Sequence, residues 1–258
     1  MNLTELLSEL RENILHDRSS LVGGTSDLLW SDATLIRYIN EAHRRFARRG
    51  LVLRDANNTR HPEVTSVTLV EDQTEYPLHE SVISILSAKV GGTVRDMART
   101  GHSVLDGYVP PDTTTFDSAS LETLAPGLPS VFSTDEQIVY DSDGSLTRVT
   151  LRVYPAPSAD HAGADVALRV VRMPLEDLTA ANMKAVPEIP RDHHLEMLDY
   201  AAYLALRIVD TDAGNSRRAD DFRKMFEAHV MEARKHARRK IFAPRPWGFG
   251  HGGFTWES

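Results

Sequence analysis

Residues 191–209 read RDHHLEMLDYAAYLALRIV, and this stretch decides the fold. One apolar stripe at helical spacing comprises Leu195, Leu198, Ala202, Ala205 and Val209. A second stripe lies beside it and comprises Met197, Ala201, Leu204 and Ile208. A helix that is apolar over so wide a face is normally buried among other elements. We therefore expect this helix to lie at the centre of the fold.

Three further amphipathic helices are predicted around it. The turn DTDAGNS leads into a last helix whose apolar face comprises Ala219, Phe222, Phe226, Val230, Ala233 and Ala237. The chain opens with a helix of about four turns, whose apolar residues are Leu3, Leu6, Leu7, Leu10 and Ile14. Gly23 and Gly24 form a loop before a second helix, which begins after the N-cap Ser31 and stops at Gly50. The apolar face of this second helix comprises Leu35, Ile39, Ala42 and Phe46.

Between these helices the hydrophobic period changes from 3.6 to 2. EVTSVTLVEDQTEYPL predicts a strand and a turn from Glu63, VISILSAKV a second strand, and ADVALRVVRMP another. Asp143 and Gly144 are turn residues of a hairpin that continues into a strand with Val149, Leu151 and Val153 alternating. We predict an α+β fold, in which N- and C-terminal helices form a four-helix bundle with an inserted antiparallel β-sandwich or barrel and an extended C-terminal tail.

The domain boundaries follow from these changes of period and from charge. We place the first half of the bundle at residues 1–59, the β-domain at 60–178, the second half of the bundle at 179–241 and the tail at 242–258. The net charge is -8, and residues 60–190 carry nineteen acidic and nine basic side chains. The flanks are almost neutral, so the middle segment has a surface of its own.

Composition excludes several classes of protein. The chain has no cysteine, so it has no disulfide, thiolate metal site or cysteine nucleophile. The N-terminal segment lacks the zones of a signal peptide, and no run is long enough to span a membrane. We expect synthesis in a cytosol.

No cofactor or metal site is predicted. Gly248, Gly250 and Gly253 have dinucleotide-binding spacing, but five residues follow Gly253 and we expect no helix there to bind the pyrophosphate. In PRDHHLEML, which contains His193, His194 and Glu196, His193 and Glu196 lie one helical turn apart and could share a metal. A histidine metal site usually needs a third protein ligand, and no second cluster is visible, so a polar first turn of a helix after Pro190 is favoured. Asp210, Asp212 and Asp221 have the spacing of positions one, three and twelve of a calcium loop. Such a loop has an oxygen ligand at position five and glycine at position six, whereas this chain has Gly214 at five and Asn215 at six. A simple helix–helix turn is therefore favoured. No catalytic motif is present, so we predict no enzyme.

The end of the last helix is strongly basic. Its cations are Arg234, Lys235, Arg238, Arg239 and Lys240. Such a segment could bind DNA, or could simply stabilise a helix C-terminus while pairing with Glu227 and Glu232. We favour a third hypothesis, an interaction face, because of the tail that follows.

The tail is rich in Pro, Gly and aromatic residues and has no period, so it cannot form a core of its own. Exposed aromatic side chains of this kind normally bury themselves in a partner and carry most of an interface's energy. The predicted anchors are Phe242, Pro244, Trp247, Phe249, Phe254 and Trp256.

The whole pattern resembles the head-to-tail connector, or adaptor, proteins of tailed bacteriophages, especially the larger adaptors of short-tailed phages. The resemblance is carried by LLWSDATLIRYINEAHRRFARRG, VTLVEDQTEYPLHESVISI, LPSVF, LTRVTLRVYPAPSADHAGADVALRVVRMP and IPRDHHLEMLDYAAYLALRIVDTDAGNSRRADDFRKMFEAHVMEARKHARRK. Where the family often has a glycine turn and a second proline, this chain has Glu71, Asp72 and His79. The departure concerns the local turn.

The resemblance implies a structural virion protein in the neck between capsid and tail, assembled in the host bacterial cytoplasm. It implies a twelve-membered ring beneath the portal protein, with the C-terminal tail docked on the portal and the β-domains offered to tail-nozzle, tail-hub or fibre proteins. Genomic DNA would pass through the channel without sequence readout.

Two other classes of function stay open on the residues alone. One is a carbohydrate- or protein-binding module, in which the acidic β-domain is the working part. The other is a hydrolase that uses paired carboxylates of the middle segment, because two facing carboxyl groups are the minimum that a glycosidase needs.

Overall fold

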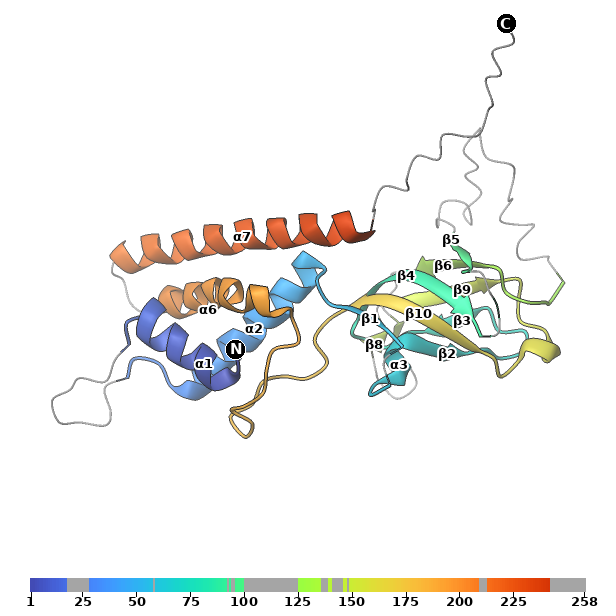
Figure 1. The fold of residues 1–258 in the computed structure, drawn as a ribbon, viewed down its shortest axis with the longest axis horizontal. Helices are drawn as coiled ribbons and strands as arrows, with labels where there is room; N and C mark the ends of the chain where they lie inside the picture. The colour runs from blue at the N-terminus through green and yellow to red at the C-terminus, as the bar shows by residue number, and fades with distance from the viewer. Residues whose placement is uncertain are drawn as a thin grey trace, which may run out of the picture.

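The computed structural model describes residues 1–17, 28–57, 59–91, 93, 96–99, 125–135, 139–140, 146–147, 149–208 and 213–241. Figure 1 shows helices gathered at one end of an elongated molecule and strands at the other. Helices from both ends of the sequence share the helical end, so the predicted mixture of helices and an intervening β-region is confirmed. None of the helices in these ranges is long and apolar enough to cross a membrane.

The helical end is built around one hydrophobic core. Helix α1 (Leu3–Ser8) begins with a capping box between Asn2 and Glu5 and continues as a π-helical segment, Glu9–Ile14. Helices α2 (Asp32–Gly50), α6 (His194–Ile208) and α7 (Ala213–Ile241) complete this end. In Figure 1, α6 lies between α7 and the pair α1 and α2. The central place predicted for the 194–208 helix is therefore confirmed.

Helix α2 begins after Ser31 and ends at Gly50, as predicted. The Ser31 hydroxyl accepts a hydrogen bond from the Thr34 N–H at 3.2 Å, which caps the helix. Gly50 is still helical, and the left-handed conformation that ends the helix belongs to Leu51, with φ of 54°. A Cβ added at Gly50 would lie 3.2 Å from Val52 Cγ1 and 3.7 Å from Ala233 Cβ. The distance to Val52 is tight and the distance to Ala233 is an ordinary van der Waals contact, so Gly50 leaves room chiefly for the Val52 side chain.

Aromatic rings hold the three long helices together. The Phe46 ring of α2 lies 5.9 Å from the Phe226 ring of α7, and the Tyr200 ring of α6 lies 4.9 Å from Phe226. Edge-to-face and tilted pairs at these distances are favourable arrangements. One predicted core residue is wrong, because Leu195 is 53% exposed in the first turn of α6, beyond the edge of the packed face.

Among the described residues, the strands form two four-stranded sheets and a short two-stranded ribbon. In the first sheet, β10 (Asp165–Arg172) pairs with β1 (Arg54–Ala56), β2 (Ser66–Thr68) and β4 (Val82–Val90). The second sheet has the order β3 (Glu75–Pro77), β9 (Thr150–Tyr154), β6 (Val131–Asp135) and β5 (Ala98–Arg99). The ribbon is β7 (Val139–Tyr140) with β8 (Leu146–Thr147). The two four-stranded sheets bury a second hydrophobic core.

Several β-region predictions need correction. The sheets do not close into a barrel, and β5 pairs with β6 in parallel, so the region is not wholly antiparallel. The strand expected from Glu63 starts later, because Pro62 begins a helical turn, α3 (Pro62–Thr65). Antiparallel pairing of β7 with β8 agrees with the predicted hairpin, while its turn residues Asp143 and Gly144 lie outside the described residues.

The turn with the unusual acidic residues is intact. Asp72 takes the left-handed conformation, with φ of 57°, in the position where a glycine would be expected. The Tyr76 hydroxyl accepts from the Val70 N–H at 3.0 Å and donates to the Gln73 carbonyl at 2.8 Å. Aspartate tolerates this conformation better than most side chains, so the departure leaves the turn in place.

Candidate interaction surfaces

The basic face predicted at the end of α7 lies on a continuous helix. Arg234 and Lys235 are exposed, and no ion pair to either occurs among the described side chains. Arg238, Arg239 and Lys240 continue the same helix to Ile241, but their side chains lie outside the described set. Cations in the last turns of a helix are favoured by its dipole. Among the described side chains, Glu227 binds Arg49 of α2 and Glu232 lies beside His236, so neither carboxylate pairs with Arg234 or Lys235.

The predicted docking tail lies outside the described residues. This applies to all six anchors, Phe242, Pro244, Trp247, Phe249, Phe254 and Trp256. The tail therefore stays a prediction from sequence.

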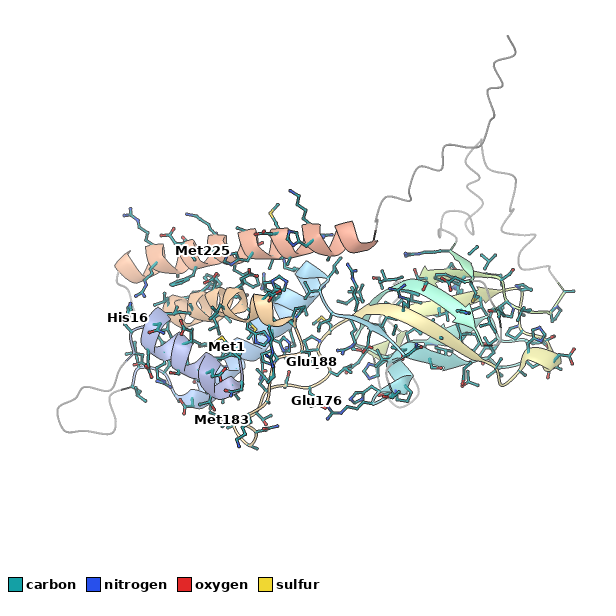
Figure 2. The ribbon with its side chains drawn as sticks, in the orientation of Figure 1. Met1, His16, Glu176, Met183, Glu188 and Met225 are labelled. Carbon is teal, nitrogen blue, oxygen red and sulfur yellow. The ribbon has the colours of Figure 1, made fainter. Side chains whose placement is uncertain are left out.

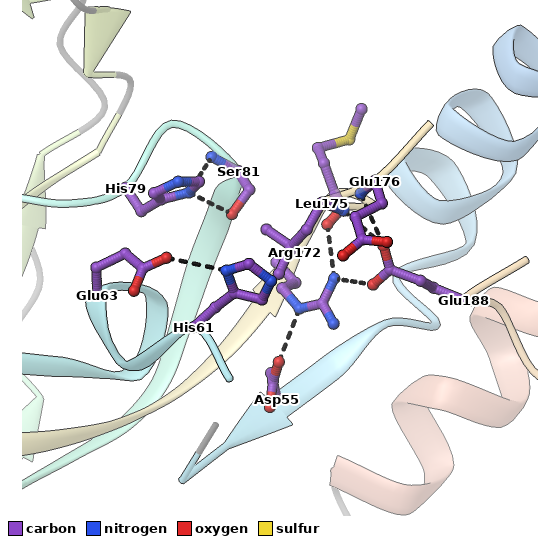
Figure 3. A network of polar contacts seen from close by, with 10 residues as sticks. Asp55, His61, Glu63, His79, Ser81, Arg172, Leu175, Glu176 and Glu188 are labelled. Carbon is purple, nitrogen blue, oxygen red and sulfur yellow. Dashed lines mark hydrogen bonds and ion pairs between the residues drawn. The ribbon is translucent and has the colours of Figure 1, made fainter. Parts of the chain in front are cut away.

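A network of polar contacts at Arg172 joins the helical end to the β-region (Figure 3). The Arg172 guanidinium lies 2.8 Å from Asp55 of β1 and 2.5 Å from Glu188, which precedes α6. It also donates to the Met173 carbonyl at 3.0 Å. The chain passes from the helical end to the β-region before Asp55 and returns before Glu188 (Figure 1). Because Arg172 binds both of these carboxylates, it links the two connections between the ends of the molecule.

The network holds Glu188 ionised. The second oxygen of Glu188 accepts from the N–H groups of Leu175 at 2.7 Å and Glu176 at 3.1 Å. Burial alone would raise the pKa of Glu188, but the hydrogen bonds from Arg172 and from these N–H groups outweigh it and lower the pKa. The Arg54 side chain adds a further tie, because it donates to the Ala237 carbonyl of α7. Sequence reasoning missed this network, and its only signal was a charged residue ending an apolar strand.

A cavity of about 410 Å³ opens beside this junction, between the start of α6 and the second half of α7. Its lining residues are Val52, Arg54, Pro190, Asp192, His193, Glu196, His229, Glu232, Ala233, His236 and Ala237. Figure 2 shows that side chains of α7 point both toward α6 and away from it. The lining of the cavity brings carboxylates and imidazoles from the turn before α6, from α6 and from α7 to one place.

The imidazoles at this cavity each have a carboxylate neighbour. His193 Nδ1 lies 2.6 Å from Glu196, His229 Nδ1 lies 3.1 Å from the buried Asp199, and His236 Nε2 lies 3.9 Å from Glu232. Burial raises the pKa of Asp199 to about 6, although His229 opposes the effect. Among the described residues, no three His, Asp or Glu side chains form a group that could hold a metal ion.

The polar first turn predicted at Pro190 is confirmed for His193 but not for His194. Arg191–His193 form a single 3₁₀ turn, and His193 lies at the edge of the cavity. His194 is fully buried, where Nε2 faces the Ile189 carbonyl at 3.0 Å and Nδ1 faces the Met1 amino group at 2.9 Å. A histidine with a partner at both nitrogens can be buried without loss, which its place in the sequence does not reveal.

The described part of the candidate calcium loop is helical. Asp210 and Asp212 lie outside the described residues, but Gly214 and Asn215 already belong to helix α7, and Asp221 lies two turns further along it. A calcium loop of the EF-hand type needs irregular backbone at these positions. The simpler hypothesis of a short helix–helix turn agrees with this arrangement.

Comparison with known families completes the description. The family model described as SU10 adaptor protein matches residues 1–247, which includes both helical segments and the β-region. No curated protein sequence matches the chain. The match supports a bacteriophage adaptor with a structural role and suggests a protein that is not an enzyme, that interacts with portal and tail proteins, and that is located in the virion neck. The chain belongs to the SU10 adaptor protein family.

Proposed function

We propose that this adaptor joins the portal protein to the tail in the neck of a short-tailed phage, as a ring of twelve copies. The observation that carries the proposal is the family match over residues 1–247, because it spans the helices of both chain ends together with the β-region. A closed ring needs a rigid subunit whose parts keep a fixed relation. The ties at Arg172 and Arg54 between the two ends of the molecule meet that need.

The helices α1, α2, α6 and α7 act in this proposal as a four-helix bundle around the DNA channel. Their common core supports this role. The proposed domain limits are 1–59, 60–178, 179–241 and 242–258. In this proposal the β-region binds tail-nozzle, tail-hub or fibre proteins. DNA passes without sequence readout, because a channel that bound phosphates tightly would hinder ejection.

The tail 242–258 docks on the portal, with the basic end of α7 beside it. Three of its six aromatic and proline anchors, Phe242, Pro244 and Trp247, fall within the family match, and the other three follow it. Large aromatic anchors concentrate binding energy, so single substitutions of them are informative.

Binding of purified adaptor to purified portal, followed by mass photometry, tests this assignment. Deletion of residues 242–258 should leave the fold intact by circular dichroism and abolish binding, and Trp247→Ala should weaken it by about tenfold or more. Thr255→Ala, in the same segment, is the matched control and should bind like the wild type. Unchanged binding by the deletion variant would overturn the role of the tail.

A further inference from the structure

Two faces of the helical end carry opposite charge. The first is the cavity beside α7, whose lining includes the carboxylates of Asp192, Glu196 and Glu232. Arg54 is the one arginine or lysine among the described residues of that lining, and its guanidinium is already hydrogen-bonded to the Ala237 carbonyl. The lining also holds the imidazoles of His193, His229 and His236, of which His193 lies beside Glu196 and His236 beside Glu232. Its three carboxylates outnumber the one guanidinium, so the cavity is a partly enclosed site that favours a cationic side chain.

The second face is the outer side of α2, where Arg37, Arg45 and Arg48 are exposed. Other arginines of α2 are paired within the molecule, Arg44 with Asp177 and Arg49 with Glu227. Within the described part of the chain, Arg48 has no such carboxylate partner. Arg45 stacks over the Tyr200 ring at 4.6 Å, and Arg37 lies 5.4 Å from the centre of the Tyr38 ring. Arg48 is therefore the arginine of this row best placed to bind a partner.

We propose that Arg48 on α2 of one copy enters the acidic cavity of a second copy, where it binds Glu196 and Glu232. A guanidinium can bind carboxylates through two parallel hydrogen bonds, which gives both energy and geometric specificity. The volume of about 410 Å³ accommodates one arginine side chain together with water.

Symmetry allows two arrangements of this contact. In a two-fold pair, Arg48 of each copy would enter the cavity of the other, and the pair would be closed. In a head-to-tail contact, each copy uses its Arg48 on one neighbour and its cavity on another, and repeats of the contact close into a ring when the rotation between copies allows it. The ring of twelve copies requires the head-to-tail arrangement. The inference thus rests on the ring of the proposed function and names the surfaces that would form it.

The absence of cysteine from the chain allows a specific cross-linking test. One preparation carries Arg48→Cys and a second carries Glu232→Cys, and the two are mixed at high concentration with a short bismaleimide. The control mixture replaces Glu232→Cys with Asp221→Cys, which is also exposed on α7 but does not line the cavity. The proposal predicts a covalent dimer that forms at least about tenfold faster with the cavity pair than with the control pair. Equal rates would overturn it and would favour a basic segment of another protein as the occupant.

Charge reversal gives an independent readout. Arg48→Glu and Glu232→Arg should each reduce self-association in sedimentation velocity. An equimolar mixture of the two variants should regain it, because the carboxylate introduced on α2 of one copy can then meet the guanidinium introduced in the cavity of the other. Failure of the mixture to recover contradicts the contact. Portal binding by single copies of the same variants is measured separately. If the contact between copies fails while portal binding is retained, the proposed function still stands.

Discussion

Replacement of Arg172 by methionine should destabilise the protein strongly, because Arg172 joins both chain crossings between the helices and the strands. The Arg172 side chain is 12% exposed, and the partner carboxylates of Asp55 and Glu188 are 16% and 25% exposed. Removing one member of a buried ion pair costs about 3–5 kcal/mol. Partial exposure of both partners reduces this, so we expect a loss of about 2–3 kcal/mol in the free energy of unfolding.

Urea unfolding at pH 7, followed by circular dichroism, measures this loss. The matched control is Arg169→Met, because Arg169 lies on the same strand, is exposed and makes no ion pair among the described residues. That control should change stability by less than about 0.5 kcal/mol. An Arg172→Met protein as stable as Arg169→Met would refute the idea that Arg172 holds the two ends together.

Three further predictions concern the response of stability to pH and the start of α2. Burial lowers the pKa of His43 from 6.5 to about 4, so the unfolded chain binds a proton that the native protein does not. His43 should therefore cost stability progressively as pH falls from about 6.5 to 4, by up to about 3 kcal/mol, and His43→Gln should flatten this dependence in urea unfolding at pH 7 and pH 5. Asp199 acts in the opposite sense, because its pKa is raised to about 6 and its stabilising protonation is lost as pH rises through that value. Asp199→Asn should steepen the loss of stability on acidification, and a parallel response of both variants would contradict these assignments. Ser31→Ala should lower stability by about 1 kcal/mol because the cap on the Thr34 N–H is lost, whereas Ser31→Asp should retain it, and equal thermal midpoints for all three proteins would speak against the cap.

The helices were predictable because the apolar residues of their packing faces recur at the helical period of 3.6 residues. Phe46, Phe226 and Val230 were all assigned to the core from spacing alone, and all are buried. The buried place of His194 was not predictable, because it depends on the Ile189 carbonyl and the Met1 amino group meeting at its ring. The helical turn at Pro62 was missed because a four-residue helix leaves no period to read.

The interaction surfaces were predictable only where their residues lie close together in the sequence. Arg234 and Lys235 could be recognised as an exposed basic segment because five cations fall within seven residues of one helix. The Arg172 network and the acidic cavity bring together residues more than a hundred positions apart, such as Asp55 with Arg172 and Arg54 with Ala237. Such sites follow from the crossing of the chain between the two ends of the molecule, and no short pattern encodes them.

The central claim, that this adaptor assembles as a ring on the portal, is tested most directly by the mass of the complex. Purified portal is mixed with excess adaptor, and the mass gain is measured by mass photometry in multiples of the 28.8 kDa chain. The proposal predicts a single population with a gain of twelve copies, and loss of that gain when residues 242–258 are deleted. A portal whose mass stays unchanged with saturating adaptor would contradict the claim.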